Sequence, residues 1–455
     1  MKQETLLYAL IAIVVFSGCG KDNELAEESV SDPTQNREIQ KIMEPTETEK
    51  SNDDSTVVYM LPKTASIELT TEQRGYVAQS NEFAFTLYRS INKNETLRDK
   101  SNITSPLSLG FVLGMLGDGA QGQTLDEIRS LLEFGKADMM EINNFFKTII
   151  EESPNIDESV TLKITNMVAY DNEVMMEEAY IQDMQTFYHA ETPMLDFGDK
   201  PIAAKYINDW SYEKTEGMIP KVINEENISE NTILALLNAI CFKATWTNKF
   251  DISNTKSESF SSSKGLSNLL MMHNKAMINY AQNEIYTMVD LPYGSGDKWS
   301  MKVLLPNKGK TVNDVVNSLS QTNWQDACKH LMPTIVDLKL PRFKIETNIE
   351  LNDILAALGA PTMFDPQNAD FSLISKNFKK SDDKQLWVSL VKQVAAAEVN
   401  EEGTKLAAVS IELMEGTSVA PVPDTADFHA NRPFVYIIQE ASSGAIFFIG
   451  AYQGE

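Results

Sequence analysis

The chain has 455 residues, of which 65 are Asp or Glu and 39 are Lys or Arg, so its formal net charge is −26. Hydrophobic residues make up 42% of it, which is enough to bury a large core and excludes a wholly disordered protein. The negative charge repels phosphate backbones and argues against nucleic-acid binding. The three cysteines, Cys19, Cys241 and Cys328, are too far apart for a CxxC metal or redox motif and too few for a disulfide scaffold.

The N-terminal segment has the pattern of an export signal. Residues 5–16 form an apolar run behind Lys2, too short for a membrane-spanning helix but of the length of a signal-peptide core. The run ends in Phe16-Ser17-Gly18-Cys19, which resembles a bacterial lipobox. We therefore expect residues 1–18 to be a lipoprotein signal peptide and Cys19 to be lipidated. The alternative is an ordinary secretory signal, and both interpretations predict export.

An acidic segment follows the signal. Residues 20–55 contain 11 acidic and 4 basic residues and no aromatic residue. Such a stretch cannot bury enough apolar surface to offset the entropy of ordering the chain. We expect residues 19–70 to be the lipidated cysteine and a flexible tether that holds the protein at a membrane. The cell surface, the periplasm and the external medium remain open as locations.

The body of the chain, residues 71–455, reads as one α+β domain. It has no composition break and no internal repeat. The apolar spacing predicts helices early and antiparallel strands late, an order typical of α+β folds. The expected helices span residues 72–90, 107–116 and 203–215, and the expected strands span residues 233–242, 301–305, 336–345, 387–399, 434–439 and 445–450.

The usual catalytic constellations are missing from the sequence. The four histidines, at positions 189, 273, 330 and 429, form no HExxH motif and no pair with metal-ligand spacing. Gly294-Ser295-Gly296 lacks the GxSxG frame of a nucleophile elbow, and Cys241 lies in an apolar run typical of a core thiol. No phosphate-binding or dinucleotide-binding loop is present. We expect no enzymatic activity, no cofactor and no metal.

The segment after residue 399 carries a family signature. Glu401-Glu402-Gly403-Thr404, followed by Ala407 and Ala408 and later by Asn431-Arg432-Pro433-Phe434, resembles the hinge and following strand of the serpin family. Matches in family order cover nearly the whole body. They include Ser105-Pro106-Leu107-Ser108, Ile207-Asn208-Asp209-Trp210, Leu237-Asn238-Ala239-Ile240-Cys241-Phe242-Lys243 with Trp246 and Phe250, and Leu340-Pro341-Arg342-Phe343-Lys344.

The resemblance implies a fold and a set of structural sites. The fold is a group of helices packed on a large, mostly antiparallel central sheet, with two further sheets and an exposed reactive loop. Trp210 matches the tryptophan of the breach at the top of the main sheet, and Ser105, Ser108 and Asn238 match the shutter lower down. Gln393 stands where the family usually has a histidine, so we expect a shutter that does not titrate near neutral pH.

The resemblance also implies a function, which is suicide inhibition of a protease. The protease would cut the loop at residues 403–423, form a covalent acyl complex, and be trapped when the loop inserts into the main sheet. An inserted strand cannot contain proline, and residues 403–420 contain none. Leu406 and Glu412 oppose insertion, because alternation turns them toward the sheet interior. The alternative is a non-inhibitory binding or chaperone protein, and we expect a monomer in either case.

The reactive bond is expected within the bait segment. The family's spacing from Glu401 places it between Thr417 and Ser418, whereas counting back from Pro433 points near Val422. Residues 406–431 contain no Lys or Arg, so a trypsin-like protease would find no suitable bond. Small and aliphatic side chains instead favour elastase-, subtilisin- or papain-like proteases.

Overall fold

The computed structural model of the whole chain describes residues 6–18, 64–95, 97–229, 231–379, 385–401 and 424–454. These residues belong to one compact unit, Met1–Cys19 with Pro62–Glu455. Several expected sites lie outside the described residues: Cys19, Glu402, Gly403, Thr404, Ala407, Ala408, Thr417 and Ser418.

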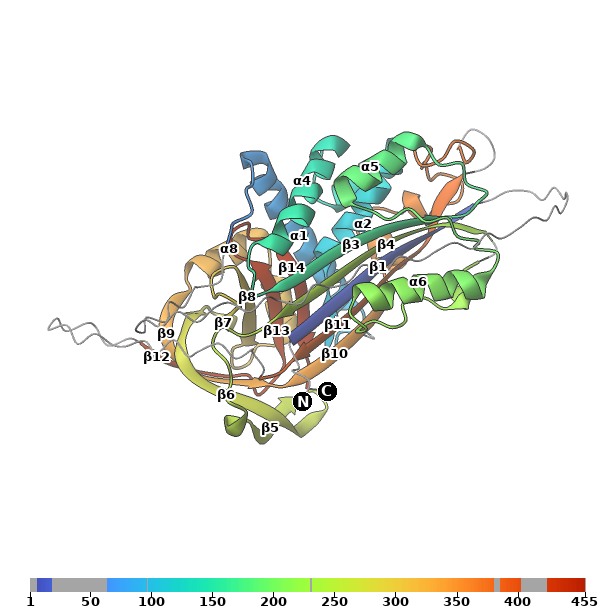
Figure 1. Cartoon of the computed structure of the whole chain (residues 1–455). Coiled ribbons are helices and arrows are strands. Elements are labelled where there is room, and N and C mark those ends of the chain that lie inside the picture. Colours follow the sequence, from blue (N-terminus) through green and yellow to red (C-terminus); the bar gives the residue numbers. More distant parts are fainter. Residues whose placement is uncertain are drawn as a thin grey trace, which may run out of the picture. The chain divides into compact units, whose positions relative to one another are not determined.

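The helices lie mostly in the first half of the chain, in line with the expected order (Figure 1). Two of the expected helices begin at side-chain caps: Thr70 caps the first, and Ser105 caps the second in front of Pro106. The helices are α1 (Thr71–Lys93), α2 (Pro106–Gly119), α3 (Gly122–Leu131), α4 (Met139–Glu152), α5 (Glu178–Tyr188), α6 (Lys200–Lys214), α7 (Val312–Ser318), α8 (Gln321–Lys329) and α9 (Asn352–Ala357).

A five-stranded sheet forms the centre of the unit. Its order is β10-β11-β1-β4-β3, and every neighbouring pair is antiparallel. The strands are β1 (Leu6–Gly18), β3 (Thr161–Tyr170), β4 (Thr232–Ala244), β10 (Phe343–Glu350) and β11 (Leu386–Val399).

The remaining strands follow one hydrogen-bonded path, β12-β9-β6-β7-β8-β13-β14-β2, with β5 paired to β6. The long strand β6 pairs with β9 on one side and with β7 on the other, so it connects two parts of this path. These two parts correspond to the two further sheets expected from the sequence. The pair β12–β9 is parallel. The strands are β2 (Asn102–Thr104), β5 (Lys256–Ser262), β6 (Gly265–Gln282), β7 (Tyr286–Tyr293), β8 (Trp299–Pro306), β9 (Met332–Pro341), β12 (Thr425–His429), β13 (Phe434–Glu440) and β14 (Ile446–Tyr452).

Strand β4 is buried on both faces, which explains its continuous apolar sequence. Leu234 and Leu236 belong to the main core, which also holds the apolar side chains of α2. Ala235 and Leu237 point the other way, into a second cluster that α6 covers. Figure 1 shows α6 lying across this second face. The central sheet is therefore a middle layer, with α6 on one face and the main core, which includes α2, on the other.

The N-terminal segment, which we expect to be a cleaved signal peptide, forms a strand in the uncut chain, and its cleavage stays a prediction. In the described chain its backbone forms β1, which pairs with β11 from Tyr8 to Gly18 and with β4 from Leu6 to Ser17. The strand occupies the position between β11 and β4, which we call the central slot. A chain that keeps its first 18 residues thus has the central slot filled.

Two further boundaries differ from the expected ones. The packed body begins before residue 71, because Thr64 bridges to Asp157 and Ile67 is buried. The expected strand 336–345 is two strands, β9 and β10, which belong to different sheets and are separated at Arg342.

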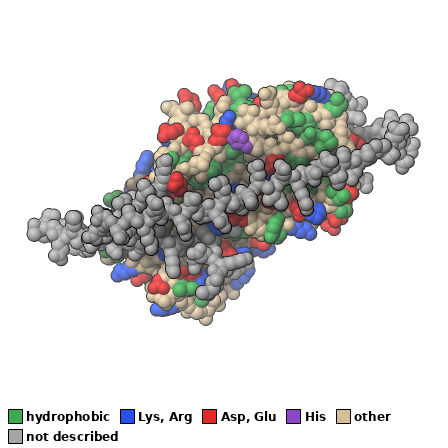
Figure 2. All heavy atoms as spheres, viewed as in Figure 1, with side chains coloured by type: hydrophobic (Ala, Val, Ile, Leu, Met, Phe, Trp, Pro, Cys, Tyr) green, Lys and Arg blue, Asp and Glu red, His purple; other side chains and the backbone are tan. Residues whose placement is uncertain are grey.

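Figure 2 shows acidic and basic side chains interspersed over one face of the molecule.

A buried carboxyl group in α2 gives the fold a testable pH dependence. Burial raises the pKa of Asp118 to about 6, although Asn143 donates a hydrogen bond to it at 2.6 Å. The unfolded value is about 3.9. Between the two values the folded chain keeps a proton that the unfolded chain has lost, so the contribution of Asp118 to stability falls as the pH rises through this window.

We expect Asp118→Asn to raise the melting temperature at neutral pH and to change it little near pH ~2, where the carboxyl group is protonated in both states. Thermal unfolding measured by circular dichroism at both pH values checks this. Glu226→Gln, on an exposed carboxyl group, is the control. An equal loss of stability at both pH values would show that the carboxyl group is not the source of a pH-dependent cost.

Candidate functional site

The end of β11 leads directly into the expected hinge, and the last described residues there are buried. Asn400 and Glu401 are each 5% exposed. The Arg342 guanidinium donates twice to Glu401 Oε2, from Nε at 2.9 Å and from Nη2 at 2.5 Å. Thr255 Oγ1 donates to the other carboxylate oxygen at 2.6 Å. A charge-assisted pair, in which two guanidinium nitrogens donate to one carboxylate oxygen, therefore holds the first residue of the expected hinge.

A tryptophan that the sequence analysis did not assign to the site also contacts this position. Trp246 Nε1 donates to the carbonyl oxygen of Asn400 at 3.0 Å. The ring stacks on Tyr293, with centroids 4.5 Å apart and planes inclined by 12°, and Phe250 meets it edge-on. The only sequence signal was that Trp246 follows the apolar run of β4 within a segment that resembles the family.

Trp210 does not lie at the breach, which corrects the assignment made from the sequence. It lies on α6, is 6% exposed, and packs with Ile207, Ala235 and Leu237 over the face of the sheet. Its Nε1 finds no acceptor among the described residues. The amphipathic pattern of α6 determines this place, because the helix turns its apolar side onto the sheet. Trp246 is the tryptophan that contacts the hinge.

The expected shutter residues come together beneath the middle of the central sheet. Ser105 accepts a hydrogen bond from the backbone N–H of Ser108 at 3.2 Å, and the Ser108 hydroxyl donates to Asn238 Oδ1 on β4. Asn238 Nδ2 donates to Asn166 Oδ1 on β3 at 2.8 Å. All four side chains are at most 1% exposed. The N-terminus of α2 is thus tied to β4 through uncharged groups.

Gln393 attaches the same helix terminus to β11. Its Nε2 donates to the carbonyl oxygen of Ser105 at 3.0 Å, and its Oε1 accepts from the hydroxyl of Thr104. Both ends of the amide are used, and the side chain is 1% exposed. A glutamine thus makes two hydrogen bonds here with a group that does not titrate.

The two strands tied to α2 are the two walls of the central slot. Ala12 of β1 is paired with Gln393 on one side and with Asn238 on the other. The carbonyl oxygen of Ser105 accepts its hydrogen bond from β11, and the hydroxyl of Ser108 donates to β4. Each of these two bonds therefore joins α2 to one wall of the slot. A strand can therefore occupy the slot while the bonds to α2 remain.

The side chains considered as nucleophiles have structural roles. Cys241 is fully buried in β4, and burial raises the pKa of its thiol to about 12, so it is not a thiolate at neutral pH. Ser295 lies in a turn and donates to Asp157 Oδ2 at 2.6 Å. Among the described residues, neither side chain makes a hydrogen bond to a histidine or a lysine that could serve as the base of an activated nucleophile.

The chain is similar in sequence and in fold to known proteins. The family described as Serpin (serine protease inhibitor) matches residues 78–453. Serpin A3-1 of Bos taurus is 33% identical over 384 residues, covering 82% of this chain and 88% of that protein. The leukocyte elastase inhibitor of Xenopus tropicalis is 30% identical over 383 residues, covering 81% and 97%. The crystal structure of human thyroxine-binding globulin with its ligand is 26% identical, with a TM-score of 0.69 over 83% of this chain and 98% of that chain.

The hinge contacts predict a specific order of mutational effects. Arg342→Ala leaves the Glu401 carboxylate buried without its counter-charge, which costs about 3 kcal/mol or more. Glu401→Gln leaves a guanidinium that is 39% exposed and can turn to solvent, so its cost is smaller. We therefore expect Arg342→Ala to lower the melting temperature more than Glu401→Gln does.

Lys344→Ala is the matched control for this comparison. Lys344 pairs with Glu398 across the same two strands, but at 3.7 Å and with a lysine that is 73% exposed. Exposed pairs of this kind contribute about 0–1 kcal/mol. If Lys344→Ala lowered the melting temperature as much as Arg342→Ala, the pair of Arg342 and Glu401 would contribute no more to stability than an exposed pair.

Proposed function

The chain belongs to the serpin family, whose members are mostly protease inhibitors and not enzymes, and on that premise we propose that it traps proteases by suicide inhibition. A protease cuts the segment 403–423 and stays attached as an acyl complex. The part of the segment before the cut then inserts into the central slot as a new strand. The partner is thus a protease, and the chain acts as a monomer.

The central slot is the observation that carries this proposal. Its walls β11 and β4 are both antiparallel to β1, so any strand in the slot runs opposite to β11. A chain that turns back after Glu401 runs in this direction. β1 shows the available length, from Ala397 to Leu386 along β11. Removal of residues 1–18 on export would vacate the slot for the cut segment.

The sequence of the hinge segment supports insertion. Residues 403–420 contain no proline, so each can supply the N–H that a central strand needs. Thr404, Ala407 and Ala408 are small and lower the barrier to entering a packed sheet. Leu406 and Glu412 act against it, because they add bulk and a carboxylate to the interior side.

A non-inhibitory binding protein is the second candidate, and two observations favour it. The first is the pair Leu406 and Glu412. The second is that human thyroxine-binding globulin, a protein that binds thyroxine, has a similar fold. In this case the segment 403–423 is only a protease substrate and the cut chain gains no stability.

The target class follows from the residues of the bait segment. The absence of Lys and Arg from residues 406–431 argues against trypsin-like enzymes. Cleavage between Thr417 and Ser418, within a run of small and aliphatic residues, suits elastase-, subtilisin- or papain-like proteases. The similarity to a leukocyte elastase inhibitor agrees with this choice.

A trapping assay tests the proposal. Purified protein mixed with an elastase-like protease is expected to form a complex that survives boiling in detergent, and Thr404→Arg is expected to abolish the complex while cleavage continues. The physical reason is that the arginine would have to enter the dry side of the sheet. Mass spectrometry of the released C-terminal fragment identifies the bond, expected to follow Thr417.

Thermal unfolding of the cut chain separates the two candidates. Insertion fills the slot and should raise the melting temperature sharply, whereas a mere substrate gains nothing. Trypsin is the negative control protease. Cleavage by every protease tested, without complex and without thermal gain, would favour the binding protein, and trapping of trypsin through this segment would refute the target assignment.

We also propose that the mature protein is exported and held at a membrane by a lipid on Cys19. The small residues before Cys19 and the acidic tether after it support this proposal. Among the described residues, none of the helices combines the length and the hydropathy that crossing a membrane requires. A secreted or tethered inhibitor would meet proteases outside the cytoplasm.

Cys19→Ser tests the anchor. The variant is expected to keep its N-terminal segment and to lose its association with membranes, because the thiol that receives the lipid is missing. Fractionation of cells and the mass of the mature N-terminus measure both effects. Cys328→Ser is the control. A wild-type protein that starts elsewhere and is found only in soluble fractions would contradict lipidation.

A further inference from the structure

Three potential metal ligands meet on the outer face of the strand pair β12–β9. Asp427 and His429 are two residues apart on β12, so both side chains leave the same face of the strand. Asp337 lies directly opposite Asp427 on β9. One ligand atom from each of the three side chains lies within 4.8 Å of the other two. Sequence spacing could not reveal this group, because Asp337 is remote from β12 along the chain.

The histidine nitrogen in this group lacks a satisfactory partner. His429 Nε2 is shielded from solvent and makes no hydrogen bond among the described residues. Its nearest carboxylate oxygen, Asp337 Oδ1, is 3.4 Å away. The cation opposite His429 on β9, Lys339, is held by Glu258 at 2.9 and 3.1 Å. Lys275 lies opposite Asp337 on β6, but no ion pair within 4.0 Å joins either aspartate to a Lys or Arg in the part of the chain that is described.

We propose that Asp337, Asp427 and His429 bind a divalent transition-metal ion, with Zn²⁺ as the best fit. One imidazole nitrogen and two carboxylate oxygens are a donor set that Zn²⁺ accepts, with water at the open position. The ion converts the repulsion between two neighbouring carboxylates into attraction and gives the shielded nitrogen its partner.

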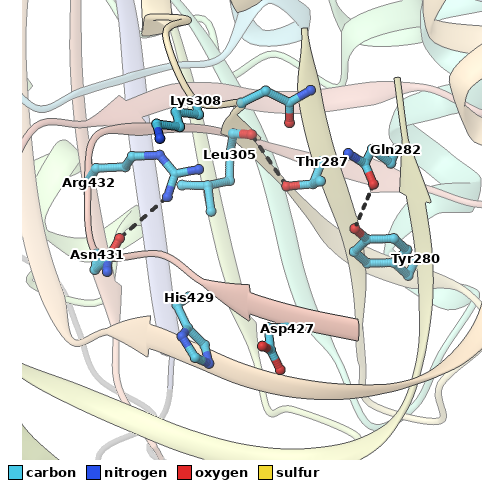
Figure 3. A pocket seen from close by; sticks show the side chains of 10 residues that line it. Tyr280, Gln282, Thr287, Leu305, Lys308, Asp427, His429, Asn431 and Arg432 are labelled. Atoms are coloured by element: carbon cyan, nitrogen blue, oxygen red, sulfur yellow. Dashed lines mark hydrogen bonds between the residues drawn. The ribbon is translucent and has the colours of Figure 1, made fainter. Parts of the chain in front are cut away.

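The site is accessible to an ion from the solvent. Asp427 and His429 form part of the wall of a cavity of about 640 Å³, which lies between β12 and the ends of β6, β7 and β8. Figure 3 shows both side chains projecting from the same side of β12. Two cations, Lys308 and Arg432, also line this cavity, and Arg432 is bonded to the carbonyl oxygen of Pro306 at 2.6 and 3.1 Å.

The position of the site gives the ion a structural effect. β12 is a short edge strand with a single neighbour, and it directly follows the segment 403–423. An ion shared by β12 and β9 would hold the C-terminal end of that segment on the sheet. This effect does not depend on whether the protein traps a protease, so its failure and that of trapping are distinguishable.

Zn²⁺ binding to the metal-free full-length chain is the test. Isothermal titration is expected to show one site that His429→Ala removes and that Asp337→Asn and Asp427→Asn each weaken by about 10-fold or more. Zn²⁺ should also raise the melting temperature of the wild type and slow hydrogen exchange of the β12 amides, and His429→Ala should show neither effect.

His189→Ala is the matched control variant. His189 also contacts one carboxylate, Glu151, at 2.8 Å, but its side chain is 53% exposed and lacks a second carboxylate in this pairing. The control should bind Zn²⁺ like the wild type. Circular dichroism without metal shows whether each variant is folded. Zn²⁺ binding that survives His429→Ala, or no binding by the folded wild type at millimolar Zn²⁺, would overturn the proposal.

Discussion

The main constraint on this structure is the hydrogen-bonding requirement of two strands, β4 and β11, that run in the same direction with the width of one strand between them. Each presents a row of backbone N–H and C=O groups to the central slot, inside a sheet that is covered on both faces. Buried backbone groups without partners cost about 1–3 kcal/mol each. Something must therefore fill the slot, or the walls must close on each other. In the described chain the backbone of β1 fills it.

The polar residues around the slot are arranged so that they tolerate such a change. The groups of the shutter, from Ser105 to Asn238 and Gln393, are neutral and fully buried, and they bind the walls to α2 from one face. Each neutral bond contributes only about 0.5–1.5 kcal/mol, but breaking it would leave two buried groups unsatisfied. In the described chain these bonds from α2 to both walls are present while β1 lies between the walls.

The sequence predicted much of this fold because local patterns and tertiary packing agree there. The capped helices α1 and α2 and the apolar strand β4 were recognisable, and Gln393 was placed at the shutter because it stands where the family usually has a histidine. Trp210 was misplaced because a buried tryptophan on an amphipathic helix and one beside a hinge look alike in sequence. The break at Arg342 was missed because apolar alternation continues on both sides of it, although the two strands join different sheets.

Other features depend on contacts between distant segments, which one sequence does not contain. The pair Arg342 and Glu401 forms only because the start of β10 lies beside the end of β11. The group around His429 depends in the same way on the parallel register of β12 and β9. The types of these side chains did not predict the pair or the group, because charged side chains are most often exposed to solvent.

The two described strands that flank residues 402–423 are held by different means. Before these residues, β11 has neighbours on both sides, and the Glu401 carboxylate is held by two hydrogen bonds from Arg342. After them, β12 has one neighbour and few paired residues. Edge strands open at lower free energy than central ones, so we expect β12 to open before β11. Any interaction that holds β12 to β9 therefore stabilises the weaker of these two strands.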